Sequence, residues 1–397
     1  MTQGAVFPVR ALVPVAEAAH AFLAPSSAHR WVFCPGSAQM EARYPETESS
    51  PEAAAGVAAH WVFQCMFEGF TPAVNDVSPN GVPIDADMLE AAQVVYQDVV
   101  MTLGPDWRAR IVVERRVHIP NVHASQNWGT PDVRGWTMHG GRWVLHVWDF
   151  KYGHKLVEAF ENWQMIDYVS GCLSEANVDG LTEQSIVVSM TVIQPRANHR
   201  DGPVRRWRVL ASDLRAHVNR LRMSAEAATG PDPKCYPHPD ACENCRARHA
   251  CEALQRASFT AMDVGYRAQP FDLTPEALGI ELRMVQRAKA FLLARESGLE
   301  EHAVSLMKRG NQVAWFSMQS SPGRKKWTVP IQQVVMMGKL AGRDFTKPLD
   351  VITPTQAAAM APHLESTIAA VSQAQVGAAK LTPDDGSRAR RIFSAPP

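Results

Sequence analysis

Hydrophobic residues recur along the chain with two different spacings, and each spacing predicts one type of element. Apolar positions three and four apart, bounded by capping residues, glycine or proline, predict helices. These helices cover residues 50–69, 86–103, 157–176, 211–228, 274–309 and 355–379. Apolar β-branched runs and strict alternation predict strands over 111–119, 131–138, 142–150 and 184–194. The order helix, sheet, helix, strand indicates an α/β or α+β core with helical additions.

Two of these elements have clear boundary signals. Ser50-Pro51-Glu52 combines a capping serine, a proline at the first helical position and an early acid, which predicts a helix start. Gly140-Gly141 predicts a tight hairpin turn between the strands 131–138 and 142–150. The hairpin matters most, because it determines which polar residues become neighbours.

The predicted hairpin brings two carboxylates together. Asp132 begins the first strand and Asp149 ends the second, and these ends are adjacent in an antiparallel pair. Lys151 lies two residues beyond Asp149 and therefore shares its face. Carboxylate oxygens suit a hard divalent cation such as Mg²⁺ or Mn²⁺. A cation of this kind beside a lysine suits the hydrolysis of a phosphodiester bond.

Composition narrows the class of protein. The chain has 397 residues, 46% of them hydrophobic, which is enough for two or three domains and excludes wholesale disorder. No window approaches 18 uncharged apolar residues, and the start lacks a signal-peptide pattern, so we expect neither a membrane span nor secretion. We therefore expect a cytoplasmic protein whose cysteines are metal ligands or core residues rather than disulfides. With 40 basic and 40 acidic residues, the chain is not expected to coat nucleic acid through bulk charge.

The neutral total hides two basic stretches. Residues 191–222 hold eight arginines against two aspartates, and residues 305–345 hold seven basic side chains against one aspartate. Arg196, Arg205 and Arg206 belong to the first, and the run Arg324-Lys325-Lys326-Trp327 belongs to the second. Each stretch is either a DNA contact or an ordinary solvated face. Trp327 either stacks on bases or packs within a small hairpin predicted over 311–330.

Taken together, these motifs resemble the PD-(D/E)xK nuclease superfamily and, within it, the RecB-like branch. Pro131-Asp132 is followed by Asp149-x-Lys151, as in the superfamily. The branch's other motifs recur in order, and they are Gly56-Val-Ala-Ala-His60, Gly129-x2-Asp132 and Gln164-x3-Tyr168. The resemblance covers about residues 26–255 and extends in detail to a phage and prophage family of exonucleases. It implies a restriction-endonuclease-like core, in which a central mixed sheet is flanked by helices.

The resemblance also implies roles for the motif residues. Asp132 and Asp149 bind the cation, and His60 supplies another ligand. Lys151 orients the attacking water. Gln164 and Tyr168 contact the DNA backbone or position Lys151. Glu114, on the strand before Asp132, lies where many relatives carry an acid, although a charge at a sheet edge explains it equally well.

Four of the seven cysteines crowd into a short Pro/Gly-rich stretch, at Cys235, Cys242, Cys245 and Cys251. Cys242-x2-Cys245 suits zinc as well as an iron–sulfur cluster, and the four together would form a local zinc site. The resemblance favours a different set, in which Cys34 joins Cys242, Cys245 and Cys251 around a [4Fe–4S] cluster, as in AddB-type nucleases. Cys235 is then an alternative ligand. The remaining two cysteines, Cys65 and Cys172, lie in apolar patterns and are expected to be buried.

The expected organisation follows from these assignments. Residues 1–25 form an N-terminal arm, 26–255 a RecB-like nuclease domain with the cysteine cluster, 265–380 a mainly helical extension with the small basic hairpin, and 381–397 a disordered tail.

The expected function is a Mg²⁺- or Mn²⁺-dependent exonuclease that degrades linear double-stranded DNA in phage recombination or DNA processing. The alternatives are a structure-specific endonuclease and a non-catalytic DNA-binding protein on a nuclease fold. The resemblance implies DNA and a phage single-strand annealing protein as partners, in the cytoplasm of a bacterial cell or phage-infected host. No membrane partner is expected, and homo-oligomerisation is left open.

Overall fold

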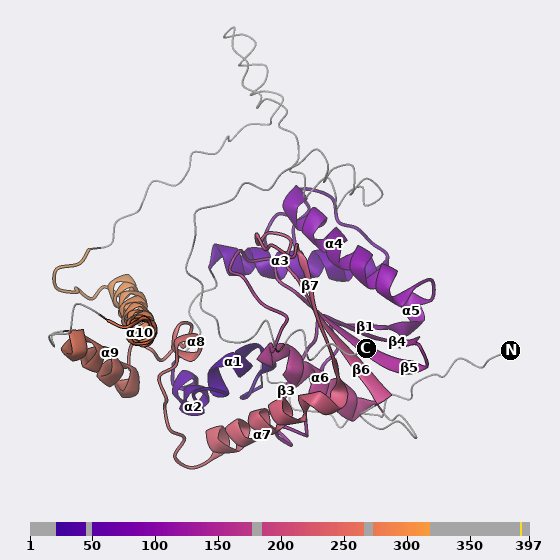
Figure 1. Ribbon diagram of the computed structural model, residues 1–397. Coiled ribbons are helices and arrows are strands. Elements are labelled where there is room, and N and C mark those ends of the chain that lie inside the picture. The colour runs from indigo at the N-terminus through magenta and orange to yellow at the C-terminus, as the bar shows by residue number, and fades with distance from the viewer. Residues whose placement is uncertain (1–20, 45–49, 177–184, 266–272, 318–389, 391–397) are drawn as a thin grey trace, which may run out of the picture. The chain divides into compact units, whose positions relative to one another are not determined.

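The structure is a computed structural model that describes residues 21–44, 50–176, 185–265, 273–317 and 390 (Figure 1). Its helices are η1 (Pro25–Ser27), α1 (Ala28–Trp31), α2 (Gly36–Ala42), α3 (Pro51–Glu68), α4 (Ala86–Leu103), α5 (Trp107–Arg110), α6 (Trp163–Glu175), η3 (Ala211–Leu214), α7 (Arg215–Thr229), α8 (Pro239–Cys242), α9 (Glu252–Gly265) and α10 (Pro275–Lys308). Its strands are β1 (Ile111–Val113), β2 (Val117–His118), β3 (Trp128–Gly129), β4 (Val133–His139), β5 (Arg142–Phe150), β6 (Ile186–Ile193) and β7 (Val204–Leu210). None of the helices in these residues is long and apolar enough to cross a membrane.

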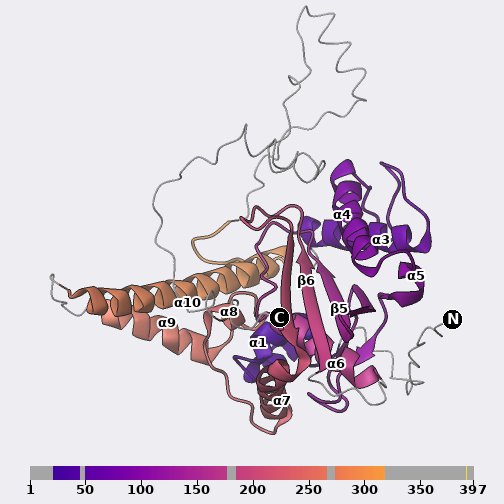
Figure 2. The same cartoon turned by 45° about the vertical axis from the view of Figure 1, so that its right-hand side comes forward.

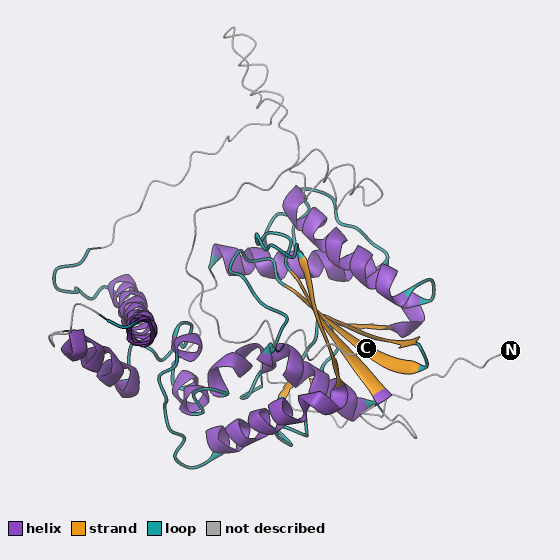
Figure 3. Ribbon diagram, in the orientation of Figure 1, coloured by secondary structure: helices purple, strands orange, loops and turns teal. Residues whose placement is uncertain are grey.

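A five-stranded mixed sheet forms the centre, in the order β1-β4-β5-β6-β7. The pair β5–β6 is parallel and the other neighbours are antiparallel. Figures 2 and 3 show α3 and α4 on one face of the sheet and α6 and α7 on the other. Each face has its own apolar core, with Trp148 and Phe150 packed toward α3 and α4 and with Leu145 and Val147 packed toward α6. The predicted mixed sheet flanked by helices is therefore confirmed.

The hairpin prediction is confirmed residue by residue. Gly140 and Gly141 both have positive φ, at 56° and 77°, as a two-residue hairpin turn requires. His139 pairs with Arg142 next to the turn, and Val133 pairs with Trp148 at the far end. Asp132 and Asp149 therefore lie next to each other at the end of the hairpin opposite the turn, as predicted.

Several predicted boundaries differ from the structure. The predicted strand 111–119 is two strands, β1 and β2, because the chain turns at Glu114, whose φ is +46°. The predicted helix 157–176 begins only at Trp163, where Asn162 caps it by accepting a hydrogen bond from the Met165 amide. The basic stretch within 191–222 contains the edge strand β7, which was not predicted. Helix α9 was not predicted either, whereas α10 confirms the helix expected over 274–309.

Two compact units divide the chain, Met1–Ser305 with Asp385–Pro397 and Leu306–Asp384. The sheet and the predicted metal site belong to the first unit, together with α9 and most of α10. The boundary predicted between residues 255 and 265 stays a prediction. Helix 355–379, the tail apart from residue 390, and most of the hairpin predicted over 311–330 lie outside the described residues, as do positions 1–20 of the predicted arm.

Candidate active site

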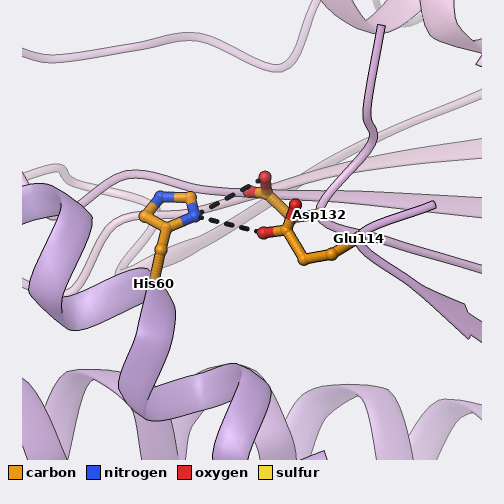
Figure 4. Close-up of side chains that lie close together, drawn as sticks. All are labelled: His60, Glu114 and Asp132. Atoms are coloured by element: carbon orange, nitrogen blue, oxygen red, sulfur yellow. Dashed lines mark ion pairs between the residues drawn. The ribbon is translucent and has the colours of Figure 1, made fainter. Parts of the chain in front are cut away.

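Three side chains from distant parts of the chain converge at the edge where the hairpin ends. His60 of α3, Glu114 after β1 and Asp132 before β4 each offer one ligand atom, and these atoms all lie within 4.8 Å of one another. Figure 4 shows the imidazole and the two carboxylates pointing toward a common centre. His60 Nδ1 lies 3.7 Å from Glu114 Oε1 and 3.6 Å from Asp132 Oδ1. All three side chains are partly buried.

The backbone explains how Glu114 reaches this centre. Its amide donates a 3.0 Å hydrogen bond to the Asp132 carbonyl, which continues the pairing of β1 with β4 by one residue. Its φ of +46° is uncommon for a residue with a side chain, and such strain is often found at functional sites. The turn directs the Glu114 carboxylate back toward Asp132. Glu114, expected only as a supporting residue, is thus part of the central group.

Asp149 and Lys151 form a second group beside the first. Lys151 Nζ donates to Asp149 Oδ1 at 3.0 Å and to Gln164 Oε1 at 3.2 Å. Gln164 Nε2 donates to the same Asp149 oxygen at 3.0 Å. The buried Tyr168 hydroxyl contacts the Gln164 side chain in turn. This chain of contacts supports the positioning role predicted for Gln164 and Tyr168.

Gly129 allows the approach of α6 to this group. A Cβ atom at Gly129 would lie 2.8 Å from a ring carbon of Tyr168 and 2.8 Å from Pro25. No side chain fits in this space, so the glycine of the Gly129-x2-Asp132 motif has a packing role.

Burial and neighbouring charges set the protonation states of the site. Burial raises the pKa of both Asp132 and Asp149. The nearby Glu114 carboxylate raises the pKa of Asp132 further, and the Asp132 carboxylate raises that of Asp149. Burial lowers the pKa of Lys151, but Asp149 and Asp132 raise it by more, so the ammonium stays charged. Burial also lowers the pKa of His60, and Asp132 and Glu114 more than offset this effect.

The donor set fits a hard divalent cation. His60 Nε2 is 3.0 Å from the Phe150 carbonyl, which can only accept, so Nε2 carries the proton and Nδ1 faces the carboxylates. Asp149 Oδ2 is buried and has no hydrogen-bond partner in the structure. Three carboxylates therefore face one permanent cation, Lys151, which leaves an excess of negative charge. The carboxylate oxygens of this group suit Mg²⁺ and Mn²⁺.

The cysteines form a second candidate site in the same unit. Five of them, Cys34, Cys235, Cys242, Cys245 and Cys251, line one cavity between α1, α2 and the α8 region. The Tyr236 amide donates to Cys34 Sγ at 3.3 Å, and the Cys235 thiol interacts with those of Cys34 and Cys251. Cys34 thus lines the same cavity as Cys242, Cys245 and Cys251, and its thiol neighbour is Cys235. Cys65 and Cys172 are buried elsewhere, as predicted.

The sulfur atoms in the described part of the chain are not gathered at the spacing that bound zinc imposes. Tetrahedral zinc with bonds of about 2.3 Å holds its sulfurs roughly 3.8 Å apart. Among the described cysteines, no three sulfurs lie within 4.8 Å of one another. Burial raises the pKa of Cys245 to about 12, so this thiol is protonated until a metal displaces its proton.

The residues predicted to contact DNA have different environments. The Arg196 guanidinium lies 4.3 Å from the Tyr152 ring centroid and is half-buried. Arg206 on β7 forms an ion pair with Asp98 of α4. Arg205 is only 5% exposed and hydrogen-bonds protein groups, so it is not available to a DNA phosphate in this conformation. Arg324, Lys325, Lys326 and Trp327 lie outside the described residues.

Sequence reasoning missed three residues beside the site. Lys155 follows Lys151 on the connection to α6 and forms an ion pair with Glu243, which lies between Cys242 and Cys245. His29 of α1 is close enough to Lys155 and Lys151 that they help burial and Arg30 to lower its pKa to about 4. Of these three, only Lys155 had a signal in the sequence, because it is a second lysine four residues after Lys151.

One family model matches residues 20–389 of the chain, and its description is "Protein of unknown function (DUF2800)". The match spans both candidate sites.

Proposed function

The chain belongs to the DUF2800 family, and we propose that it is a metal-dependent deoxyribonuclease, most simply an exonuclease acting on linear double-stranded DNA. The observation that carries this proposal is the convergence of His60, Glu114 and Asp132 within 4.8 Å, beside the hydrogen-bonded pair Asp149 and Lys151. A structural ion-pair network also brings charges together. Here, in addition, a buried carboxylate oxygen of Asp149 has no hydrogen-bond partner and can serve as a ligand.

The roles follow from the contacts. His60, Glu114, Asp132 and Asp149 would hold Mg²⁺ or Mn²⁺, and a bound ion would polarise the phosphate and lower the pKa of water. His60 is oriented by the Phe150 carbonyl through Nε2, which leaves Nδ1 for the ion. The Phe150 amide donates to Asp132 Oδ2 at 2.6 Å and fixes that carboxylate. The chain thus builds the site from rigid strand ends.

Lys151 acts as a cation in this proposal. Its carboxylate neighbours keep it protonated, so it does not accept a proton from water at neutral pH. Its Nζ can orient the attacking water and balance the charge that develops on the phosphoryl oxygens. Gln164 holds Nζ on one side and Asp149 on the other. Tyr168 acts through Gln164.

The test is incubation of the full-length protein with linear and circular duplex DNA and Mg²⁺ or Mn²⁺. Degradation of linear DNA alone, abolished by Asp149→Ala and by Lys151→Ala, supports the exonuclease. Nicking or cutting of circular DNA by the wild-type protein would instead make it an endonuclease. DNA binding without cleavage under every metal condition would favour the non-catalytic alternative. Cleavage that persists at wild-type rate in Lys151→Ala would show that the site is misassigned.

We also propose that the five-cysteine cavity holds a [4Fe–4S] cluster, because Cys34 lines the same cavity as Cys242, Cys245 and Cys251, the four cysteines of the AddB-type set. Such a centre would join α1 to the segment after α7, far apart in sequence. Iron and sulfide analysis of anaerobically purified protein, with a visible absorption spectrum, tests this. Stoichiometric zinc without iron would replace the cluster by a structural zinc ion.

A further inference from the structure

The connection between β5 and α6 is tied to a buried glutamine. Gln194 follows β6 directly and its side chain is 0% exposed. Its Nε2 donates to the carbonyls of Gly153 at 2.8 Å and Lys155 at 2.7 Å. Its Oε1 accepts from the Val157 amide at 3.1 Å. One side chain therefore satisfies three backbone groups of a segment that would otherwise be solvated.

Arg205 completes this attachment from the edge strand β7. Its NH2 donates to the Val157 carbonyl at 2.7 Å and to Gln194 Oε1 at 2.8 Å, and its Nε also reaches the Val157 carbonyl at 3.2 Å. The planar guanidinium holds the loop and the glutamine together in a fixed geometry. We call Gln194 and Arg205 the brace, and residues 153–157 the braced loop.

The braced loop carries a lysine that follows the candidate active-site residues closely in the chain. It begins two residues after Lys151 and presents Lys155, whose side chain is 65% exposed. Lys155, Lys151 and Arg30 all lie near enough to His29 to help lower its pKa, and Glu243 acts on it in the opposite direction. Lys155 is therefore near Lys151 in space as well as in sequence. Glu243 is the acid that Lys155 contacts in the structure. A phosphate next to the scissile one can take the place of Glu243, because both present anionic oxygens to the ammonium.

We propose that Gln194 and Arg205 are positioning residues that hold the braced loop so that Lys155 binds the DNA phosphate adjacent to the one that is cut. This inference rests on the proposed nuclease function and deepens it. The Lys151 backbone is held separately, because its amide donates to the Ile193 carbonyl at 2.9 Å. Loosening the brace should therefore weaken DNA binding while leaving Lys151 and the chemical step in place.

The test measures DNA binding and cleavage in the full-length protein with Gln194→Met, Arg205→Lys, Lys155→Met and the double variant Gln194→Met/Lys155→Met. Binding of a short linear duplex is measured with Ca²⁺ to suppress cleavage, and kcat and KM are measured with Mn²⁺. Matched controls are Gln93→Met on the exposed side of α4 and Arg208→Lys, an exposed arginine of the same strand as Arg205. Hydrogen exchange of the Val157 amide gives a readout that needs no activity.

Each brace variant should raise the Kd for DNA and the KM about tenfold, the loss expected for one charge-assisted contact, with kcat within about threefold of wild type. The double variant should be no worse than Lys155→Met, because both changes act through one contact. Val157 should exchange faster in Gln194→Met. The inference would be overturned if the double variant lost as much DNA affinity as the two single changes added together. It would also be overturned if the Val157 amide exchanged faster in the brace variants while their Kd for DNA stayed unchanged. A wild-type protein that cleaves no DNA would instead overturn the proposed function itself.

Discussion

Replacing Asp132 by asparagine should stabilise the metal-free protein while removing most of its response to Mn²⁺. The Asp132 side chain is 13% exposed and lies near a second carboxylate, Glu114. Burial and Glu114 raise its pKa in the folded state, so its ionised form is disfavoured there. For an acid with a raised pKa, stability is lost as pH rises above the unfolded value, which is about 3.9. As pH rises above that value, the wild-type protein increasingly carries this cost unless a cation neutralises it.

The structure gives the sign and an approximate size. Asparagine keeps an oxygen that can accept from the Phe150 amide, now 2.6 Å from Asp132 Oδ2, and removes one negative charge from the group. It gives up the attraction to His60 across 3.6 Å. Substitutions that relieve a strained functional site commonly gain about 1 kcal/mol, or about 2 °C in Tm for a unit of this size. A cation at 100 times its Kd should stabilise the wild-type protein by about 2.7 kcal/mol, or roughly 5 °C.

Thermal unfolding of both proteins in EDTA and in excess Mn²⁺ measures this effect, with the exposed Asp213→Asn as the matched control. Asp132→Asn should melt above wild type in EDTA and below it in Mn²⁺, and it should not cleave DNA. Equal Mn²⁺ shifts in the two proteins would refute Asp132 as a ligand. A lower Tm than wild type in EDTA would show that the contact with His60 outweighs the repulsion.

Three further outcomes are expected. In Gly36→Ala the new methyl group would lie 2.6 Å from Cys235 Sγ, so the free energy of unfolding should fall by about 1–3 kcal/mol. The control Gly279→Ala has open space around the new methyl group and should be neutral or stabilising. Equal changes in Tm for the two variants would contradict this. Burial, with help from nearby arginines, lowers the pKa of His146 from 6.5 to about 4, so the free energy of unfolding should fall by roughly 3 kcal/mol between pH 6.5 and 4. In His146→Gln the free energy of unfolding, measured by denaturant titration at several pH values, should depend less on pH across that range. An unchanged pH dependence would refute the assignment. Tyr168→Phe loses the contact with Gln164 and should lower kcat about tenfold at unchanged Mn²⁺ affinity; a change in Mn²⁺ affinity alone would place Tyr168 in cation binding.

The sequence predicted the parts of the fold that depend on local pattern. The two glycines at the hairpin turn and the capped start of α3 at Ser50 are signals within a few residues, and the structure follows them. The alternation in 142–150 predicts a strand, but in β5 both faces are buried from Val144 to Phe150. Asp132 and Asp149 could be paired because hairpin register follows from the turn. The metal group is predictable to that extent.

The missed features depend on contacts between distant segments. Glu114 turns with positive φ because Asp132 holds its amide, and nothing in the residue type predicts that conformation. Residues 157–162 have a helical pattern but stay out of α6, since Gln194 and Arg205 bind the preceding backbone. β7 was overlooked because its arginines suggested a charged surface. The alternation of Trp207 and Val209 with exposed arginines was the available strand signal.

The cysteine cavity has a consequence for the protein while it is being made. Cys34 and Tyr236, whose amide contacts its sulfur, are 202 positions apart. At translation rates of about 5–20 residues per second, the first thiol waits roughly 10–40 s for its partners to leave the ribosome. During that interval Cys34 is a free thiol on an incomplete chain, open to oxidation or to pairing with other nascent molecules. Oxygen supply and the speed of synthesis, rather than the mature fold alone, therefore set how much of the expressed protein acquires an intact five-thiol cavity.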